Sequence, residues 1–331
     1  MNFAKYLKLS AAPHVYSATD VKSPFRDRKL LNNPCSTLEE PMGDAEGMNT
    51  SESTSQSELY RRRSLEEYST EAAVQKYVNA SAGAGIAYLL QHVYGPLYEE
   101  QLDKVINQKK GKEGLRILEY GCGGGMNLIW IVKRLLDRQI NIDFACGTDF
   151  SAKMVQAANR EASYTLPNAM RSKVFFYTVA NEDLGRDLPT FLGRRLGDLR
   201  DAFHLVLGVN TFRFCFRLGT QAESANGIFS LVRPGGYSVL IDMNRYYPFF
   251  RSRLGSALTH PEDQPYLPSL DEYATVFRDA GFDIEMSGNF CWVPHSAGPA
   301  EVAILRAASP VLQRLFSRFA MRSLVVARKP W

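Results

Sequence analysis

Hydrophobic and polar positions alternate with two different periods from Leu115 to the C-terminus. Short runs of apolar and β-branched residues, bounded by glycine, proline or polar residues, are typical of buried strands. Longer stretches place their apolar residues on one face of a helix, as Leu128, Ile131 and Leu135 do. The expected strands cover residues 115–120, 140–147, 174–179, 203–209, 237–242, 282–286 and 322–328. The expected helices lie near 126–138, 151–162, 221–232 and 269–280.

This alternation predicts one α/β fold, with a seven-stranded, mostly parallel sheet and helices on both of its faces. Residues 111–331 would form that domain. Residues 59–110 read as a helical cap, with Ser64 and Glu67 as a capping box and a break near Gly95 and Pro96.

Residues 1–58 have a different composition. The segment 36–58 is acidic and almost free of apolar residues, so burial cannot offset its chain entropy, and we expect a mobile linker. Residues 1–35 carry scattered hydrophobic side chains that could dock as an arm on the main domain.

Composition narrows the class of protein. Of the 331 residues, 45% are hydrophobic and 22% are charged, which is ordinary for a globular protein, and the net charge is +4. No basic stripe interleaved with aromatic residues is visible, so no nucleic-acid partner is expected. The N-terminal residues lack the pattern of a signal peptide, and no apolar run reaches the roughly 20 residues of a membrane span. The five cysteines are widely spaced and form no CxxC pair, so we expect free thiols and no zinc site. Free thiols are typical of a reducing compartment, which predicts a cytoplasmic location.

A glycine-rich turn follows the first expected strand. Ile117–Tyr120 runs into Gly121-Cys122-Gly123-Gly124-Gly125 and then into a helix. Glycines let the backbone approach a ligand closely, and the new helix presents free N–H groups. The dinucleotide-binding fingerprint would need a third glycine where Met126 stands, which argues against a nicotinamide cofactor.

The order Glu119, Gly121, Gly123 and Gly125 resembles the first motif of class I S-adenosylmethionine (SAM)-dependent methyltransferases of the small-molecule type. Later segments also resemble that family: Gly147–Ser151 with the following helix, Asn181–Leu184, Leu205–Asn210 and Leu231–Tyr237. The resemblance covers about residues 70–330 and implies a Rossmann-like fold that binds SAM and releases S-adenosylhomocysteine.

The resemblance implies a set of cofactor-binding residues. Asp149 would accept hydrogen bonds from the ribose diol, and Asp183 would accept one from the adenine amino group. The residues expected at the cofactor are Tyr77, Glu119, Gly121, Cys122, Gly123, Gly125, Asn127, Asp149, Phe150, Asn181, Glu182, Asp183, Gly208 and Asn210.

Methyl transfer needs an acceptor held in line with the sulfonium and sometimes a base, so no fixed catalytic residue is required. Ligands of open α/β sheets bind beyond the carboxyl ends of the strands, and this rule nominates residues after strands four and five. The candidates for catalysis are His295, as a base in an aromatic loop, with Asn210 and Tyr246; no metal site is expected. Residues 246–250 could line an aromatic pocket, and residues 300–319 could form a lid, a dimer face, an interfacial helix or an ordinary core helix.

The function predicted from the sequence is methyl transfer from SAM to a small organic acceptor, such as a secondary metabolite or an aromatic, isoprenoid or lipid-like compound. The sequence is compatible with a homodimer and does not decide the oligomeric state. The main alternative is a SAM-binding regulatory or assembly subunit without turnover. RNA methylation is disfavoured by the weak net charge, and an NAD-dependent reaction is disfavoured by Met126.

Overall fold

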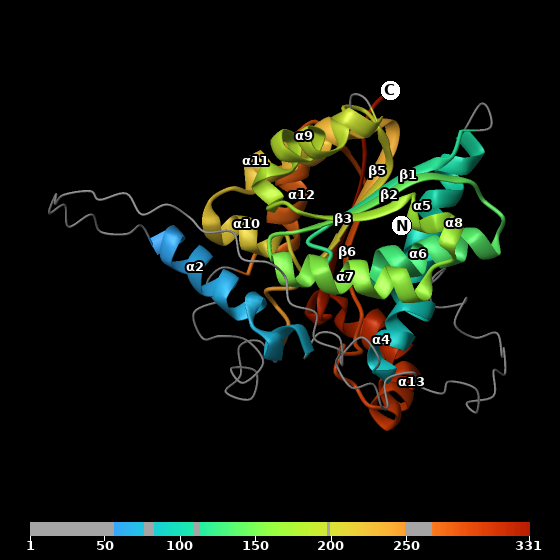
Figure 1. The fold of residues 1–331 in the computed structure, drawn as a ribbon. Coiled ribbons are helices and arrows are strands. Elements are labelled where there is room, and N and C mark those ends of the chain that lie inside the picture. The colour runs from blue at the N-terminus through green and yellow to red at the C-terminus, as the bar shows by residue number, and fades with distance from the viewer. Residues whose placement is uncertain (1–55, 76–82, 109–112, 197–198, 249–266) are drawn as a thin grey trace, which may run out of the picture.

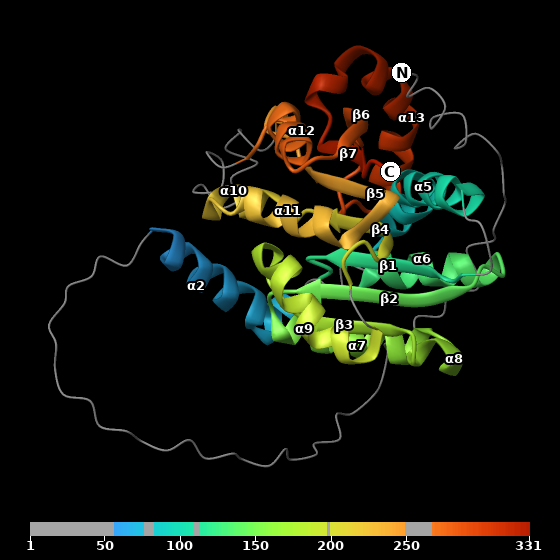
Figure 2. The same cartoon turned by 90° about the horizontal axis from the view of Figure 1, so that it is seen from above.

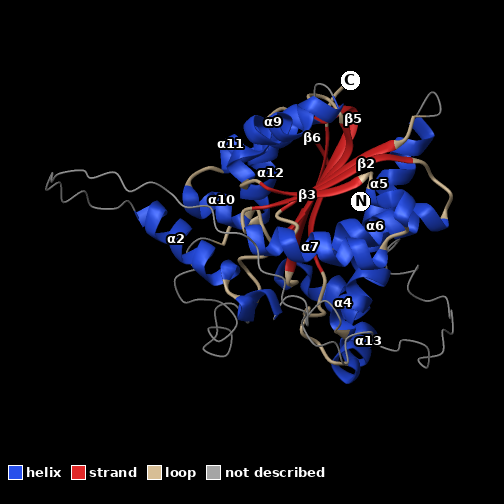
Figure 3. Cartoon of the chain, viewed as in Figure 1, coloured by secondary structure: helices blue, strands red, loops and turns tan. Residues whose placement is uncertain are grey.

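The structure, a computed structural model, describes residues 56–75, 83–108, 113–196, 199–248 and 267–331. A twisted seven-stranded sheet forms the centre, and helices lie on either side of it (Figures 1 and 3). Its strands are β1 (Leu115–Tyr120), β2 (Ile142–Asp149), β3 (Val174–Thr178), β4 (Phe203–Val209), β5 (Val232–Met243), β6 (Asp283–Phe290) and β7 (Arg322–Arg328).

The strand order is β3-β2-β1-β4-β5-β7-β6. Figure 2 shows this order along the sheet. The strands β1 to β5 pair in parallel, whereas β7 runs antiparallel to both β5 and β6. The expected α/β fold with a mostly parallel seven-stranded sheet is therefore confirmed, and only the direction of the last strand departs from the parallel rule.

The helices pack on the two faces of the sheet as two separate hydrophobic clusters. One face carries α5 (Gly95–Gln108), α6 (Met126–Asp137) and α7 (Ala152–Thr165). The other carries α9 (Leu184–Leu196), α11 (Gln221–Leu231) and α12 (Leu270–Asp279). Shorter elements are α8 (Asn168–Arg171), the 3₁₀ segments η2 (Asn181–Asp183) and η6 (Ser317–Phe319), and α10 (Arg213–Leu218). The outer helices are α2 (Gln56–Ser69), α4 (Ala84–Leu89) and α13 (Pro299–Phe316).

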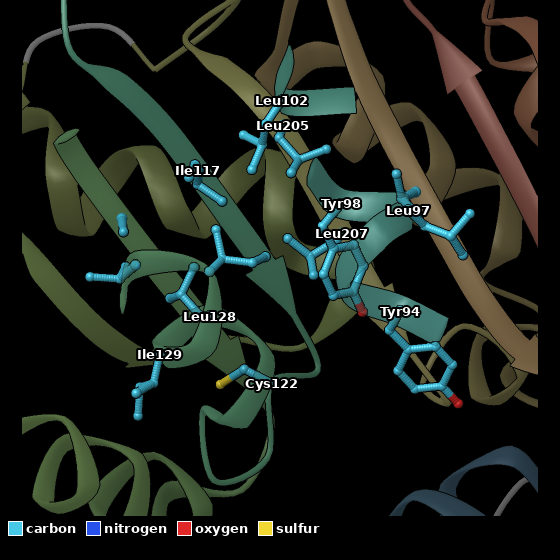
Figure 4. Packing of buried hydrophobic residues seen from close by; sticks show 14 of the residues in the cluster. Tyr94, Leu97, Tyr98, Leu102, Ile117, Cys122, Leu128, Ile129, Leu205 and Leu207 are labelled. Carbon is cyan, nitrogen blue, oxygen red and sulfur yellow. The ribbon is translucent and has the colours of Figure 1, made fainter. Parts of the chain in front are cut away.

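The side chains of alternate strand residues explain the two clusters. Ile117 of β1 and Leu205 and Leu207 of β4 face the side of α5 and α6, while Leu118 and Val206 face the opposite side. Figure 4 shows the first cluster, in which α5 and the segment before it bring Tyr94, Leu97, Tyr98 and Leu102 against Leu205 and Leu207. Burial of the apolar side chains in these two clusters is the main force that stabilises the sheet and holds the helices on its faces.

Some expected boundaries were wrong. Strand β2 begins and ends two residues later than predicted, so Asp149 is its last residue. Strand β5 begins at Val232, because the Pro-Gly-Gly turn lies inside the strand, with Gly235 at a φ of 74°. Ser64 lies inside α2 and forms no capping box, since that helix begins at Gln56.

The expected break at Gly95 and Pro96 is also absent. A π-helical segment, Leu90–Tyr94, leads directly into α5. A side chain on Gly95 would lie 2.3 Å from the Trp130 ring, so close packing against α6 explains this glycine. Pro96 lies directly after the π-helical segment, so the N–H donor that proline lacks is missing where the helix changes its hydrogen-bond pattern.

Candidate functional site

The glycine loop after β1 requires glycine at different positions for different reasons. Gly121 has a φ of 57°, and a Cβ there would lie 2.0 Å from Thr211 Oγ1. Gly125 has a φ of 78°, and a Cβ there would meet the Phe176 ring at 2.7 Å. A Cβ on Gly123, by contrast, would have no neighbour within 4 Å. The two outer glycines thus allow the loop to pack, and the middle one leaves open space beside the backbone.

Glu119 ties this loop to helix α6. Its side chain is buried and accepts hydrogen bonds from Asn127 Nδ2 at 2.7 Å and from the Leu128 N–H at 2.9 Å. Burial raises the pKa of Glu119 to about 8, although both hydrogen bonds oppose that rise. Tyr98 donates a hydrogen bond to Asn127 Oδ1, so the pair Glu119–Asn127 is held from the side of α5 as well.

Asp149 connects the end of β2 to the same loop. Its Oδ2 accepts from the Gly123 N–H at 2.9 Å, and its Oδ1 accepts from the Ser151 N–H at 2.9 Å. The side chain is 6% exposed, and burial raises the pKa of Asp149 to about 6. Ser151 in turn caps α7 and donates to the Tyr68 carbonyl at 2.8 Å, which anchors α2 beside the loop. The carboxylate therefore lies at the point where β2, α2 and the glycine loop meet.

Asn210 follows β4 in a conformation that is rare outside glycine, with a φ of 57°. Its Oδ1 is buried and has no hydrogen-bond partner. A buried carbonyl oxygen without a donor is costly, and it marks a position where a ligand donor could be accommodated.

Asp242 fixes the neighbouring end of β5. Its fully buried carboxylate accepts from the backbone N–H groups of Met243 and Arg213 and pairs with Arg213 Nη1 at 3.2 Å. These bonds commit Asp242 to positioning the segment after β4 rather than to a ligand.

The glycine loop and the carboxyl ends of β1, β2, β4 and β5 border one cavity of about 790 Å³. It is lined by Glu119, Gly121–Gly124, Met126, Asn127, Asp149, Phe150 and Val209–Thr211 on the loop side. Further lining residues are Tyr68, Ile86, Met154, Arg213, Phe214, Met243, Tyr247, Pro248, Trp292, Pro294–Ser296, Leu305, Leu312, Met321 and Arg322. The cavity lies at the carboxyl ends of the parallel strands, where ligands of this sheet type bind, and its volume suits a small-molecule ligand.

The lining residues that come from the ends of β5 and β7, from the segment 292–296 and from helix α13 are mostly apolar, and we call this part the apolar half of the cavity. Helix α13 contributes Leu305 and Leu312 to it, and Trp292 is held by a hydrogen bond from its Nε1 to Gln313 of the same helix. Helix α4 packs beside α13 (Figure 1). A Cβ on Gly85 of α4 would lie 2.5 Å from the Pro294 carbonyl oxygen, so this glycine allows α4 to contact the 294–297 segment directly.

His295 lies in that segment and faces the cavity. Its Nε2 is 3.2 Å from the hydroxyl of the buried Tyr94. Burial and the charge of Arg322 lower the pKa of His295 to about 3. The imidazole is therefore neutral at physiological pH, and it binds a proton only weakly.

Comparisons with known proteins bear on the fold. No protein-family model and no curated protein sequence matches this chain. Among solved structures, it is similar to the citrinin polyketide synthase CMeT domain, at 15% identity over 74% of this chain, with a TM-score of 0.48. The chain spans 55% of the length of that polyketide synthase chain.

Two further solved structures are similar over comparable lengths. Geranyl diphosphate C-methyltransferase from Streptomyces coelicolor A3(2) matches at 15% identity over 74% of this chain and 82% of its own, with a TM-score of 0.46. The [4+2]-cyclase SpnF matches at 18% identity over 70% of this chain and 80% of its own, with a TM-score of 0.43. At these identities the likeness concerns the fold only. The strand order with an antiparallel β7, together with the glycine loop after β1, decides the fold type. The chain has a Rossmann-like fold with the strand order that is typical of class I SAM-dependent methyltransferases.

Most of the residues predicted for the cofactor border the cavity. Those that line it are Glu119, Gly121, Cys122, Gly123, Asn127, Asp149, Phe150 and Asn210. Gly125 lies in the same loop and packs on Phe176. Gly208 does not line the cavity; a Cβ there would lie 2.1 Å from the Tyr120 ring, so packing explains it. Tyr77 falls outside the described residues.

The predicted adenine segment is engaged in other contacts. Asn181 donates to Thr211 Oγ1 at 2.9 Å and so braces the start of the segment after β4. Glu182 pairs with Arg61 of α2 at 2.6 Å, and Asp183 pairs with Arg186 at 2.7 Å. None of Asn181, Glu182 and Asp183 is among the cavity-lining residues, so their role at the cofactor stays a prediction.

Of the catalytic candidates, His295 and Asn210 border the cavity, but Tyr246 does not. The Tyr246 ring packs under the Arg318 guanidinium, 4.7 Å from its carbon. The neighbouring Tyr247 lines the cavity instead. The structure thus places Tyr247 rather than Tyr246 at the cavity, and the catalytic role of Tyr246 stays a prediction.

Sequence reasoning did not select several lining residues. Arg322 is the first residue of β7, and Met321 directly precedes it. Tyr68 and Ile86 come from the outer helices α2 and α4. Leu305 and Leu312 show that the helix within residues 300–319 borders the cavity, and the four roles that the sequence left open for it stay predictions. Within the part of the chain that the structure describes, no cluster of three or more His, Cys, Asp or Glu could hold a metal ion. No helix among the described residues is long and apolar enough to cross a membrane.

Proposed function

We propose that this protein transfers a methyl group from SAM to a small organic acceptor. The observation that supports the proposal is the single cavity that joins the glycine loop, with Glu119 and Asp149, to an apolar chamber with Trp292 and His295. A cofactor in the first half would place its reactive end toward the second half. When bound, SAM supplies a methyl group on a sulfonium sulfur, which is transferred by in-line displacement.

Several features of this chain fit that cofactor. The open space beside Gly123 admits a ligand close to the backbone, and the buried Oδ1 of Asn210 could accept from its amino group or hydroxyl. Asp149 is the residue we propose for the ribose diol, because an ionised carboxylate can accept from two hydroxyls. Gly121, Cys122, Asn127 and Phe150 would complete the cofactor half of the cavity.

The acceptor half would position its ligand and exclude water, which accounts for much of the rate in a displacement of this kind. His295 is the proposed base, since it is neutral and faces the cavity. Its low pKa restricts this role to an acceptor whose proton is already acidic, because proton transfer is efficient only between groups of similar pKa.

The remaining parts of the proposal concern organisation. Residues 59–110 would cover the cofactor, as the lining positions of Tyr68 and Ile86 suggest, and residues 111–331 would form the catalytic domain. The buried free thiols Cys122, Cys146, Cys215 and Cys291 support a reducing compartment such as the cytoplasm. The homodimer stays a prediction, and residues 1–55 lie outside the described residues.

The experiment that tests the function is incubation of the pure protein with methyl-labelled SAM and a fractionated cell extract. Asp149→Ala serves as the control. Label in one small-molecule or lipid fraction that depends on Asp149 would support the proposal and identify the acceptor class. Label in RNA or protein would point to a different acceptor class. Tight binding of SAM with no labelled fraction from any extract would favour the non-catalytic alternative.

A further inference from the structure

Arg322 is a buried cation at the ligand edge of the sheet. It is the first residue of β7, and because β7 runs antiparallel to β5, Arg322 pairs with Met243, the last residue of β5. On its other side it pairs with Phe290, the last residue of β6. The strand directions thus bring the start of β7 to the edge where the parallel strands end, and Arg322 lines the cavity.

The charge of Arg322 has no anionic partner among the described residues. The residue is 4% exposed, and its Nε and Nη1 atoms have no hydrogen-bond partner. Tyr94 supplies only a neutral hydrogen-bonding neighbour. The nearby Asp242 is committed to Arg213, at 3.2 Å. An unpaired buried guanidinium opposes folding, so its presence in a well-packed site calls for a compensating anion.

The surroundings of Arg322 define what could bring that anion. The same half of the cavity is lined by Met243, Tyr247, Trp292, Leu305, Leu312 and Met321, which offer an apolar surface. The Nε and Nη1 atoms without partners are donors of a charged guanidinium, and the oxygens of a carboxylate or phosphate are the acceptors that such donors bind most strongly. A ligand with an oxyanion at one end and an apolar body would satisfy both features.

We propose that the methyl acceptor is an amphiphilic acid whose oxyanion group, a carboxylate or a phosphate, binds Arg322 while its apolar body lies against Trp292 and helix α13. This inference rests on the proposed function, since it assigns the acceptor half of the same cavity. Arg322 would orient the acceptor through its oxyanion group and would not exchange the methyl group or the proton, which makes it a residue for specificity rather than for chemistry.

The test measures binding of small acids to the protein saturated with S-adenosylhomocysteine, by titration calorimetry. The probes are 3-phenylpropionate, decanoate and 3-phenylpropyl phosphate, each compared with an uncharged analogue, the amide or the alcohol. We expect at least one acid to bind about 10-fold or more tighter than its neutral analogue, since a charge-assisted bond to a buried arginine is lost in the analogue. Arg322→Met is expected to remove this preference, and Arg314→Met on the exposed side of α13 to retain it.

Two further readouts separate the explanations. Arg322→Met is expected to leave S-adenosylhomocysteine affinity unchanged and the unfolding temperature equal or higher, because it removes a buried unpaired charge. A clear fall in the unfolding temperature would assign Arg322 a structural role and overturn the proposal. Acids that compete with S-adenosylhomocysteine would overturn it too, because Arg322 would then belong to the cofactor half.

The failure of this inference differs from the failure of the proposed function. A wild-type protein that binds neither SAM nor S-adenosylhomocysteine would refute the function itself. A protein that binds S-adenosylhomocysteine but shows no preference for any acid, or binds none of the probes, would refute only the assignment of Arg322.

Discussion

Replacing Asp149 tests the cofactor half of the cavity most directly. The Asp149 carboxylate accepts two backbone hydrogen bonds, from Gly123 and Ser151, each at 2.9 Å. Asp149→Ala removes both acceptors and leaves two N–H groups unpaired at a nearly buried position. It also removes the proposed contact with the ribose diol.

The expected loss follows from the number and kind of these bonds. A hydrogen bond to a charged group contributes about 1.5–3 kcal/mol, and the disordered loop adds to the loss. We therefore expect Asp149→Ala to weaken the binding of SAM by roughly 2–4 kcal/mol, which corresponds to about 30- to 1,000-fold in the dissociation constant. Asp149→Asn keeps the shape of the side chain but supplies one acceptor oxygen instead of two, so an intermediate loss is expected.

Calorimetry with S-adenosylhomocysteine measures this loss without turnover. Asp143→Ala is the matched control, because Asp143 lies at the opposite end of β2 and pairs with Arg116 at the surface. A 2′-deoxyribose analogue of the ligand separates the two roles of Asp149. It should bind the wild-type protein more weakly than the parent ligand, and this difference should shrink in Asp149→Asn.

The pH dependence gives a second view of the same group. The pKa of Asp149 is about 6 in the ligand-free protein, and a bound diol favours the ionised form. Affinity should therefore fall as the pH drops through 6, by about 10-fold between pH 7.5 and pH 5. Asp149→Asn should lack this dependence. A folded Asp149→Ala variant with wild-type affinity would refute the assignment.

Three other predictions concern the loop, the buried acid and the histidine. Gly121→Ala should lower the free energy of unfolding, measured in urea, by about 2 kcal/mol or more, because Gly121 has a positive φ and its added Cβ would clash with Thr211. Gly124→Ala is the control and should change this free energy little, because open space surrounds Gly124. Glu119 holds a proton up to about pH 8 in the folded protein and only to about 4.5 when unfolded, so the folded state loses stability as the pH rises through that window. Between pH 6.5 and 8, urea unfolding should show a loss of about 1.6 kcal/mol relative to Glu119→Gln, which lacks this titration. His295→Ala should lower kcat by about 10²-fold or more if the imidazole removes the acceptor proton, and an unchanged kcat would leave it a structural contact of Tyr94.

Much of the fold could be predicted because the hydrophobic period is a local property of the chain. The bounds of β1, β4 and β7 agree with the expected ranges, since in each the apolar run has clear polar or glycine ends. The boundaries that failed depend on pairing with distant segments. Val232 joins β5 because Phe203 lies opposite it, five residues before the point at which the Pro-Gly-Gly signal suggested a start.

The site divides in the same way. Glu119, Asp149 and the glycines lie at strand ends that follow one another in the chain, so order and spacing were enough to group them. The choice between Tyr246 and Tyr247 depended on side-chain direction after a strand end, where the turn at Asn244 sets the geometry. That turn is held by Asn244 bonds to Arg318 and Ala320, residues more than 70 positions away, and no local pattern reports them.

Arg322 shows why the acceptor half was harder to predict than the cofactor half. The apolar pattern of the last strand is the same in either direction, so it does not say which end lies at the ligand edge. In a parallel arrangement Arg322 would lie at the opposite edge, and Arg328 would take its place. Pairing of Arg322 with Met243 and of Arg328 with Tyr237 fixes the direction, and with it the end of β7 that meets the cavity. A charge at the start of the last strand therefore acquires a functional meaning only when the antiparallel pairing is known, whereas the acids of β1 and β2 acquire theirs from the chain order alone.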